Sequence, residues 1–157
     1  MQTNILEYLE QTVTRVPNKV AFANDTMGIT FRETYDQARA VGSFLHSEGY
    51  YRQPVVVFMK KHPTTLVSFF GTIYSGNYYV PLDDEMPSHR IDLILRTLKP
   101  QAMICDEDTC ELVKQFAYEG KTYIFSEICH TPVNEAALAS IRDRQIDTDP
   151  IYIVFTS

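Results

Sequence analysis

The chain has 157 residues, 45% of them hydrophobic and 22% charged, and a net charge of −6 at pH 7. This composition is typical of one ordinary globular domain and excludes a disordered or fibrous chain. The charges are scattered without a basic stripe, which argues against a nucleic-acid partner. No signal-peptide pattern opens the chain and no run of about 18 apolar residues occurs, so we expect no membrane association and a cytoplasmic location.

The first predicted elements are a helix and a hairpin. Apolar residues at helical spacing between 4 and 16 predict an amphipathic helix, with Asn4 as its N-cap. Two short apolar runs, 20–23 and 29–31, flank turn-forming residues at 24–28. These runs predict a small antiparallel hairpin near the N-terminus.

A capping box marks the start of the next helix. Thr30 is followed three residues later by Glu33, and apolar residues then recur on one face. The pattern predicts a helix that continues to about Glu48, where Gly49 stops it.

From residue 55 onward, apolar runs alternate with helical patterns at nearly regular intervals. Such spacing is typical of strand–helix–strand crossovers, and a further apolar run at the end of the chain predicts one more, buried strand. Residues 134–142 predict a helix before it. The sequence therefore predicts an α/β fold with three layers, a largely parallel sheet covered by helices on both faces. The predicted strands are 55–58, 79–82, 102–105, 123–125 and 151–155.

Three cysteines and four histidines offer little for a metal site. The cysteines are odd in number and form no C-x-x-C pair, and no histidine lies at ligand spacing from a cysteine. We therefore expect neither a disulfide framework nor a metal bound by this chain alone.

Three separated stretches resemble a known family. Residues 29–35 (Ile-Thr-Phe-Arg-Glu-Thr-Tyr), 76–83 (Gly-Asn-Tyr-Tyr-Val-Pro-Leu-Asp) and 149–157 (Asp-Pro-Ile-Tyr-Ile-Val-Phe-Thr-Ser) are similar, in order and spacing, to the opening motifs of adenylate-forming, AMP-binding enzymes. The middle stretch discriminates best, and it resembles the amino-acid-activating branch. That branch holds nonribosomal peptide synthetase adenylation domains and D-alanine–D-alanyl carrier protein ligases. Asp84 departs from the proline common at this position, which weakens assignment to one subfamily.

The resemblance implies an ATP- and Mg2+-dependent ligase. Such an enzyme forms an aminoacyl adenylate and passes the acyl group to the thiol of a phosphopantetheinyl carrier protein. The ligase-like appearance of the chain suggests D-alanine as the amino acid. The resemblance covers residues 1–157 but only about the first third of a typical member, so it implies the N-terminal portion of an adenylation domain.

Thr156 and Ser157 are the only candidate cofactor-binding residues. In the family, a threonine and a serine open a glycine-rich phosphate loop, and the glycines do not follow here. Because several backbone N–H groups must turn toward one phosphate, two residues cannot form the loop. We expect this chain alone to be inactive and to bind no cofactor tightly, and we assign no catalytic residue to it.

Other conspicuous residues favour structural roles. Pro81 and Asp83 are interpreted as a chain turn and its cap, and Arg90 as an ion-pair partner of a nearby acidic residue such as Asp83. Lys60 and Lys61 follow a strand where open α/β sheets gather ligands, but a solvated pair is the favoured interpretation.

Two alternatives remain open at this point. The chain could be a free-standing α/β module that binds a partner protein, or an unrelated flavodoxin-like domain, which would not explain the three motifs. Adjacent aromatic residues also predict an exposed apolar surface through which the chain self-associates. These pairs are Tyr50 and Tyr51, Phe69 and Phe70, and Tyr78 and Tyr79.

Overall fold

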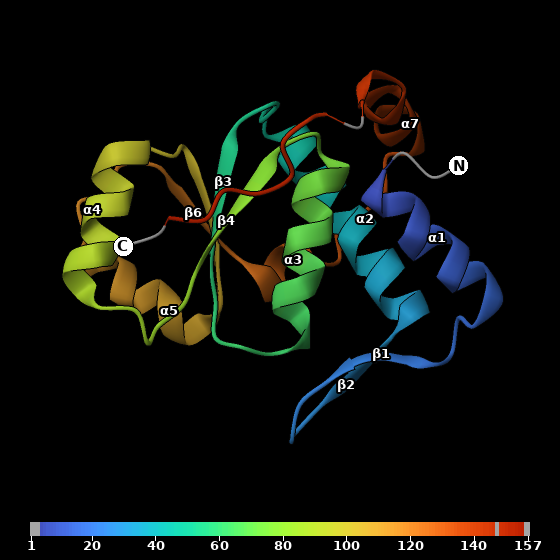
Figure 1. The fold of residues 1–157 in the computed structure, drawn as a ribbon, viewed down its shortest axis with the longest axis horizontal. Coiled ribbons are helices and arrows are strands. Elements are labelled where there is room, and N and C mark those ends of the chain that lie inside the picture. Colours follow the sequence, from blue (N-terminus) through green and yellow to red (C-terminus); the bar gives the residue numbers. More distant parts are fainter. Residues whose placement is uncertain (1–3, 147, 156–157) are drawn as a thin grey trace.

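The computed structural model describes residues 4–146 and 148–155. Its centre is a parallel sheet with the strand order β4-β3-β5-β6, which confirms the predicted α/β class (Figure 1). The strands are β3 (Pro54–Phe58), β4 (Tyr78–Leu82), β5 (Ala102–Cys105) and β6 (Lys121–Ile124).

Alternate residues of β3 enter two separate cores. Val55 and Val57 pack on one face of the sheet, and Val56 and Phe58 pack on the other. This alternation follows from the two-residue repeat of a strand, and all four side chains are almost completely buried. The sheet therefore needs a cover on both faces, as a continuous apolar strand predicts.

Helices supply both covers, which confirms the three-layer prediction (Figure 1). On the first face lie α2 (Phe31–Ser47), α3 (Pro63–Tyr74) and α6 (Phe125–Ile128), and α1 (Ile5–Arg15) and α7 (Glu135–Arg144) pack against α2 and α3. The second face is covered by α4 (Ser88–Leu98), α5 (Glu107–Leu112) and the 3-10 turn η1 (Val113–Gln115). Within residues 4–146 and 148–155, no helix is long and apolar enough to cross a membrane.

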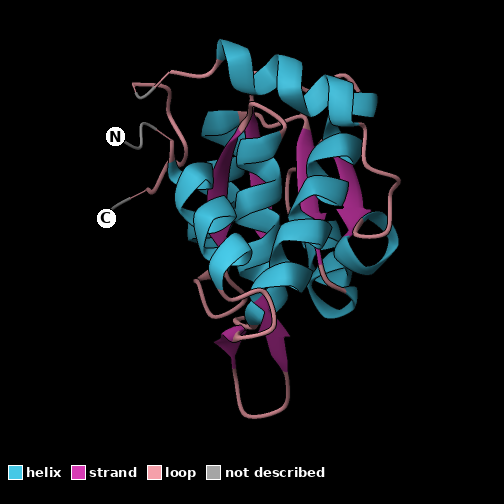
Figure 2. Ribbon diagram, turned by 90° about the vertical axis from the view of Figure 1, so that its right-hand side faces the viewer, coloured by secondary structure: helices cyan, strands magenta, loops and turns pink. Residues whose placement is uncertain are grey.

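The predicted hairpin consists of β1 (Val20–Ala23) and β2 (Gly28–Thr30), and it projects beyond the body of the protein (Figures 1 and 2). The capping box directly after it is also confirmed. The Glu33 backbone N–H donates to Thr30 Oγ1, and the Thr30 backbone N–H donates to Glu33 Oε1, each at 3.1 Å. These two bonds fix the start of α2 against β2.

The prediction of a buried last strand at 151–155 is wrong. This segment lies alongside the edge strand β4 and forms a single parallel bridge, between Tyr79 and Tyr152 (Figure 1). Tyr152 is 52% exposed and Val154 is 56% exposed. Ile151, Ile153 and Phe155 are only partly buried against the two cores. The reason is that no described segment pairs with the outer side of residues 151–155, so this segment is not enclosed as a central strand would be.

The predicted strand 123–125 is wrong at its last residue. Phe125 begins α6, and β6 ends at Ile124. Ile124 pairs with Cys105, the last residue of β5, so Phe125 has no partner left in the neighbouring strand.

Helices α2 and α3 are in close contact at Gly42 of α2 and Gly71 of α3. Of the two, Gly71 leaves less space for a side chain. A Cβ atom at Gly71 would lie 2.6 Å from Val41 Cβ and 3.0 Å from the Ala38 carbonyl oxygen. Since these atoms belong to a buried helix face, the neighbours cannot move aside cheaply.

We expect Gly71→Ala to lower the free energy of unfolding by about 1–3 kcal/mol, because the added methyl group overpacks the helix contact. Urea unfolding followed by circular dichroism measures the change. Gly28→Ala is the matched control, since its Cβ would meet nothing closer than Val20 Cγ1 at 3.4 Å. Equal midpoints for the two variants would show that the α2–α3 contact is loose.

Candidate site at the carboxyl ends of the strands

The neighbouring strands β3 and β5 lead to helices on opposite faces of the sheet. α3 follows β3 on one face, and α5 follows β5 on the other (Figure 1). The crevice between the carboxyl ends of two such strands is the place where open α/β sheets bind ligands. Residues 60–62 and 106–109 border this crevice.

The Asp106 carboxylate occupies the crevice. Its Oδ2 accepts a hydrogen bond from the Lys60 backbone N–H at 2.8 Å. Its Oδ1 accepts from the backbone N–H groups of Asp108 and Thr109 at 3.0 and 2.7 Å. These backbone N–H groups are the donors that would otherwise bind an anion. The Asp106 side chain already occupies them, so they are not available to a ligand.

The pKa of Asp106 reflects two opposing effects. Burial of the carboxyl acts to raise its pKa, but the hydrogen bonds from the three backbone N–H groups and from Thr109 Oγ1 outweigh burial and leave the pKa lowered. The charged form is therefore the one built into the fold. Sequence reasoning missed this residue, although Asp106 followed by Thr109 is itself a capping-box pattern.

Lys60 and Lys61, considered as ligand groups, do not converge on a site. Lys60 Nζ lies 3.0 Å from Asp108 Oδ2 at the surface, and this hydrogen bond raises the pKa of Lys60. Lys61 is exposed. In the described residues, no group of three or more His, Cys, Asp or Glu side chains could hold a metal ion.

The turn after β4 has the structural role that the sequence predicts. Asp83 Oδ1 accepts a hydrogen bond from the Glu85 backbone N–H at 2.9 Å, and the Asp83 carbonyl accepts from Met86 N–H at 3.2 Å. Pro81 lies within β4. Asp83 therefore forms the predicted turn, whereas Pro81 is opposite Val57 of β3 and is not part of the turn.

The interpretation of Arg90 as an ion-pair partner of Asp83, Asp84 or Glu85 needs correction. The structure shows no ion pair between Arg90 and Asp83, Asp84 or Glu85, all of which it describes. The Arg90 guanidinium in the first turn of α4 donates instead to the Phe155 carbonyl oxygen. The cause is geometric. The Phe155 carbonyl lies beside the first turn of α4, and a carbonyl without a strand partner needs another donor.

Thr156 and Ser157, the predicted phosphate-loop residues, lie outside the described residues. The structure does describe the preceding residues, 151–155. Tyr152 pairs with Tyr79 in parallel register, so the chain runs toward the carboxyl end of β4 (Figure 1). Arg90 then holds the carbonyl of the last described residue, Phe155.

An apolar groove of about 770 Å³ lies at the same end of the sheet, between the hairpin and α3. Sequence reasoning missed it, because its walls come from positions between 21 and 83 that share no local pattern. The apolar walls include Phe22, Met59, Leu66, Phe69 and Leu82.

Residues 9–157 match the AMP-binding enzyme family. The chain belongs to this family. It is 32% identical, over 100% of its own length, to a D-alanine–D-alanyl carrier protein ligase of Listeria monocytogenes serotype 4b, of which it covers 31%. It is 23% identical over 98% of its length to tyrocidine synthase 1 of Brevibacillus parabrevis, covering 14% of that protein.

Solved structures show the same fold. The nonribosomal peptide synthetase FmoA3 superposes with a TM-score of 0.80 at 21% identity, covering 96% of this chain and 16% of that one. The fatty acid AMP ligase from Legionella pneumophila superposes with a TM-score of 0.72 at 15% identity, covering 89% of this chain and 25% of that one. The chain thus spans a third or less of these AMP-binding relatives.

We expect Asp106→Ala to lower the free energy of unfolding by about 2 kcal/mol, since three backbone N–H groups, of which that of Thr109 is buried, lose their acceptor. Asp108→Ala is the matched control, because it removes only an exposed ion pair and should cost less than about 1 kcal/mol. Chemical denaturation of both variants at pH 7 provides the comparison. A smaller loss for Asp106→Ala than for the control would contradict the assigned role.

The lowered pKa of Asp106 also predicts a pH dependence. The carboxyl has a lower pKa in the folded state than its ordinary value of 3.8, so its contribution to stability is fully present above that value. The contribution should disappear as the pH falls through the lowered pKa. Unfolding midpoints measured from about pH 2 to about pH 6 should decrease less steeply with acid in Asp106→Asn than in the wild type, because the variant lacks this carboxyl.

Proposed function

We propose that the chain is the N-terminal portion of an amino-acid-activating ligase. The longer protein would form an aminoacyl adenylate from ATP and pass the aminoacyl group to the thiol of a carrier protein. The supporting relatives are carrier protein ligases that match the chain from end to end. D-alanine is the proposed amino acid, because it is the one that these relatives' names state.

One geometric observation carries this proposal. The segment 151–155 runs parallel to β4, so it is directed toward the carboxyl edge of the sheet. Ligands of open α/β sheets bind at this edge. A phosphate loop that continues from Phe155 would therefore start with its N–H groups at the correct end of the strands.

The residues of this chain would act mainly as a scaffold. Thr156 and Ser157 would offer the first hydroxyl and N–H groups to the phosphates of Mg-ATP, and Arg90 would hold the strand that delivers them. No described residue at this edge is placed as a general base, and the loop glycines lie outside the sequence. We propose that the 157 residues alone neither adenylate nor transfer.

The alternative function, a free-standing module that binds a partner protein, rests on a different observation. The outer side of residues 151–155 exposes Tyr152 and Val154 next to an unpaired backbone edge. Such an edge accepts another strand. In that case the exposed edge, and not a nucleotide, would be the functional feature.

Amino-acid-dependent exchange of pyrophosphate into ATP tests the two proposals. We expect the longest reading frame that contains this chain to show exchange with D-alanine, and the 157-residue chain to show none above background. Exchange by the 157 residues alone would overturn the scaffold role. A reading frame that ends at Ser157 would exclude the ligase and favour the binding module.

We also expect Arg90→Ala in the active, longer protein to lower exchange by about tenfold, because the strand leading into the phosphate loop loses its anchor. Arg96→Ala, on the same helix and paired with Asp92 at the surface, is the matched control. Steady-state exchange rates decide the point. Equal rates for the two variants would show that the Phe155 contact does not position the loop.

A further inference from the structure

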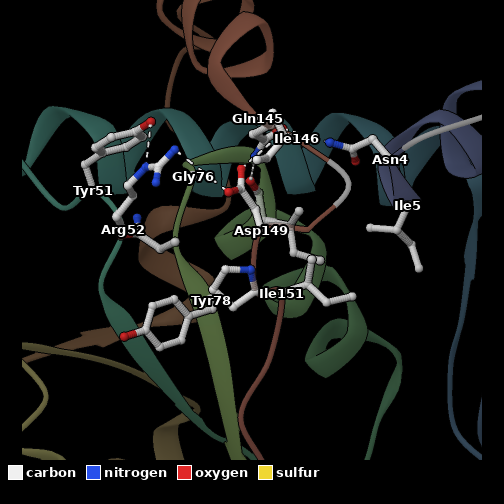
Figure 3. A pocket seen from close by; sticks show the side chains of 13 residues that line it. Asn4, Ile5, Tyr51, Arg52, Gly76, Tyr78, Gln145, Ile146, Asp149 and Ile151 are labelled. Carbon is white, nitrogen blue, oxygen red and sulfur yellow. Dashed lines mark hydrogen bonds and ion pairs between the residues drawn. The ribbon is translucent and has the colours of Figure 1, made fainter.

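A second cavity lies at the opposite end of the sheet, at the amino ends of β3 and β4 (Figure 3). It measures about 420 Å³ and is bordered by the start of α1 and the segment after α7. The switch-point crevice lies at the other end of the sheet. Parts of two family motifs do line the cavity, namely residues 76–78 and 149–151. Its residue Arg52 lies outside those motif stretches.

Arg52 is the charged residue that opens into this cavity, and its backbone is unusual. Its φ of 53° lies in the left-handed region, which non-glycine residues rarely adopt. The Arg52 backbone N–H donates to the Gly76 carbonyl at 3.1 Å, which holds this conformation. A strained residue at the wall of a cavity is a recognised mark of a functional position.

The Arg52 guanidinium has donors to spare. Its Nε donates to Tyr51 Oη at 3.3 Å, and its Nη2 lies 3.8 Å from Asp149 Oδ1, beyond hydrogen-bond distance (Figure 3). A guanidinium has five N–H donors. Most of them therefore make no hydrogen bond to any residue that the structure describes, and the Arg52 side chain is 59% exposed.

Gln145 and Asp149 of the cavity already form hydrogen bonds within the protein. Gln145 donates to the Ile73 carbonyl at 2.7 Å and accepts from Asn4 at 3.0 Å. Asp149 Oδ2 accepts from the Ile146 backbone N–H at 2.9 Å. An incoming anion would thus find most of its available N–H donors on the guanidinium of Arg52.

A second guanidinium, that of Arg144, lies near Tyr51, which lines the cavity. The Arg144 guanidinium lies 4.5 Å from the ring centre of Tyr51, and that of Arg52 lies 5.6 Å from it. Tyr51 itself is fixed over Gly76, where a Cβ atom would lie 2.6 Å from the ring. The Arg52 and Arg144 guanidinium groups therefore lie near the same ring, and Asp149 is the carboxylate that pairs with Arg52.

The remaining wall is apolar. Ile5 and Ile146 are 42% and 61% exposed, which is high for isoleucine, and both line the cavity together with Ile151 (Figure 3). Exposed aliphatic side chains beside a cationic group match a ligand that has an anionic head and a short apolar body.

We propose that this cavity binds a small monocarboxylate with a short aliphatic group. The carboxylate accepts from the unoccupied N–H groups of Arg52, and the aliphatic group lies against Ile5 and Ile146. A guanidinium and a carboxylate often form two parallel N–H···O hydrogen bonds, which orient the ligand. The proposal is independent of the proposed ligase function, because it requires neither ATP nor the residues beyond 155.

The test is a titration of the 15N-labelled 157-residue chain with isobutyrate, followed by amide chemical shifts. We expect saturable shifts confined to the residues that line the cavity. Isobutyramide, which has the same shape without charge, and inorganic phosphate, which has charge without an apolar body, should bind at least about tenfold more weakly. Equal shifts with either compound, or no shifts with isobutyrate, would overturn the proposal.

Three variants sharpen the test. Arg52→Gly removes the guanidinium while glycine accepts the left-handed backbone, so folding is retained and isobutyrate affinity should fall at least about tenfold. Asp149→Asn removes the competing carboxylate, and affinity should rise severalfold. Arg96→Gln, which removes an equally exposed guanidinium on α4, should leave affinity unchanged. Retained affinity in Arg52→Gly would assign the binding to another place.

Discussion

Burial of β3 on both faces is the constraint on which the rest of the structure depends. A strand without access to water must pair all of its backbone N–H and C=O groups within the protein. β4 and β5 satisfy this need, with Val56 opposite Val80 on one side and Met103 on the other. The two cores, the helices that cover them and the crevice between the ends of β3 and β5 all follow from this arrangement.

Local patterns account for what the sequence predicted well. The capping box of Thr30 and Glu33 and the apolar periodicity of the helices depend on residues within a few positions of each other. The segment 151–155 could not be judged in this way, because its state depends on a partner for its outer side. Asp106 had a local capping signal but also bonds to Lys60, and only the fold brings that backbone N–H to it.

A polar cluster ties the two ends of the chain together. Glu10 on α1 forms two hydrogen bonds with the Arg142 guanidinium on α7 and accepts a third from the Tyr74 hydroxyl. Burial, and then the Glu10 carboxylate, raise the pKa of Tyr74, so the hydroxyl stays a donor at neutral pH. Through α7, this cluster also positions Gln145 and the segment that crosses to β4.

The two ends of the sheet are joined by that crossing segment. Asp149 faces Arg52 at the amino end, and Phe155, six positions later, is held by Arg90 at the carboxyl end. A carboxylate bound to Arg52 would compete with Asp149, so it would bind more tightly to an arrangement in which Asp149 has turned away. If the longer protein proposed above binds nucleotide and this shifts residues 149–155, a carboxylate at Arg52 would change the affinity for nucleotide by the same factor as nucleotide changes the affinity for the carboxylate. The size of that factor depends on how rigidly the Tyr79–Tyr152 bridge transmits motion along a segment that has only one bridge to the sheet.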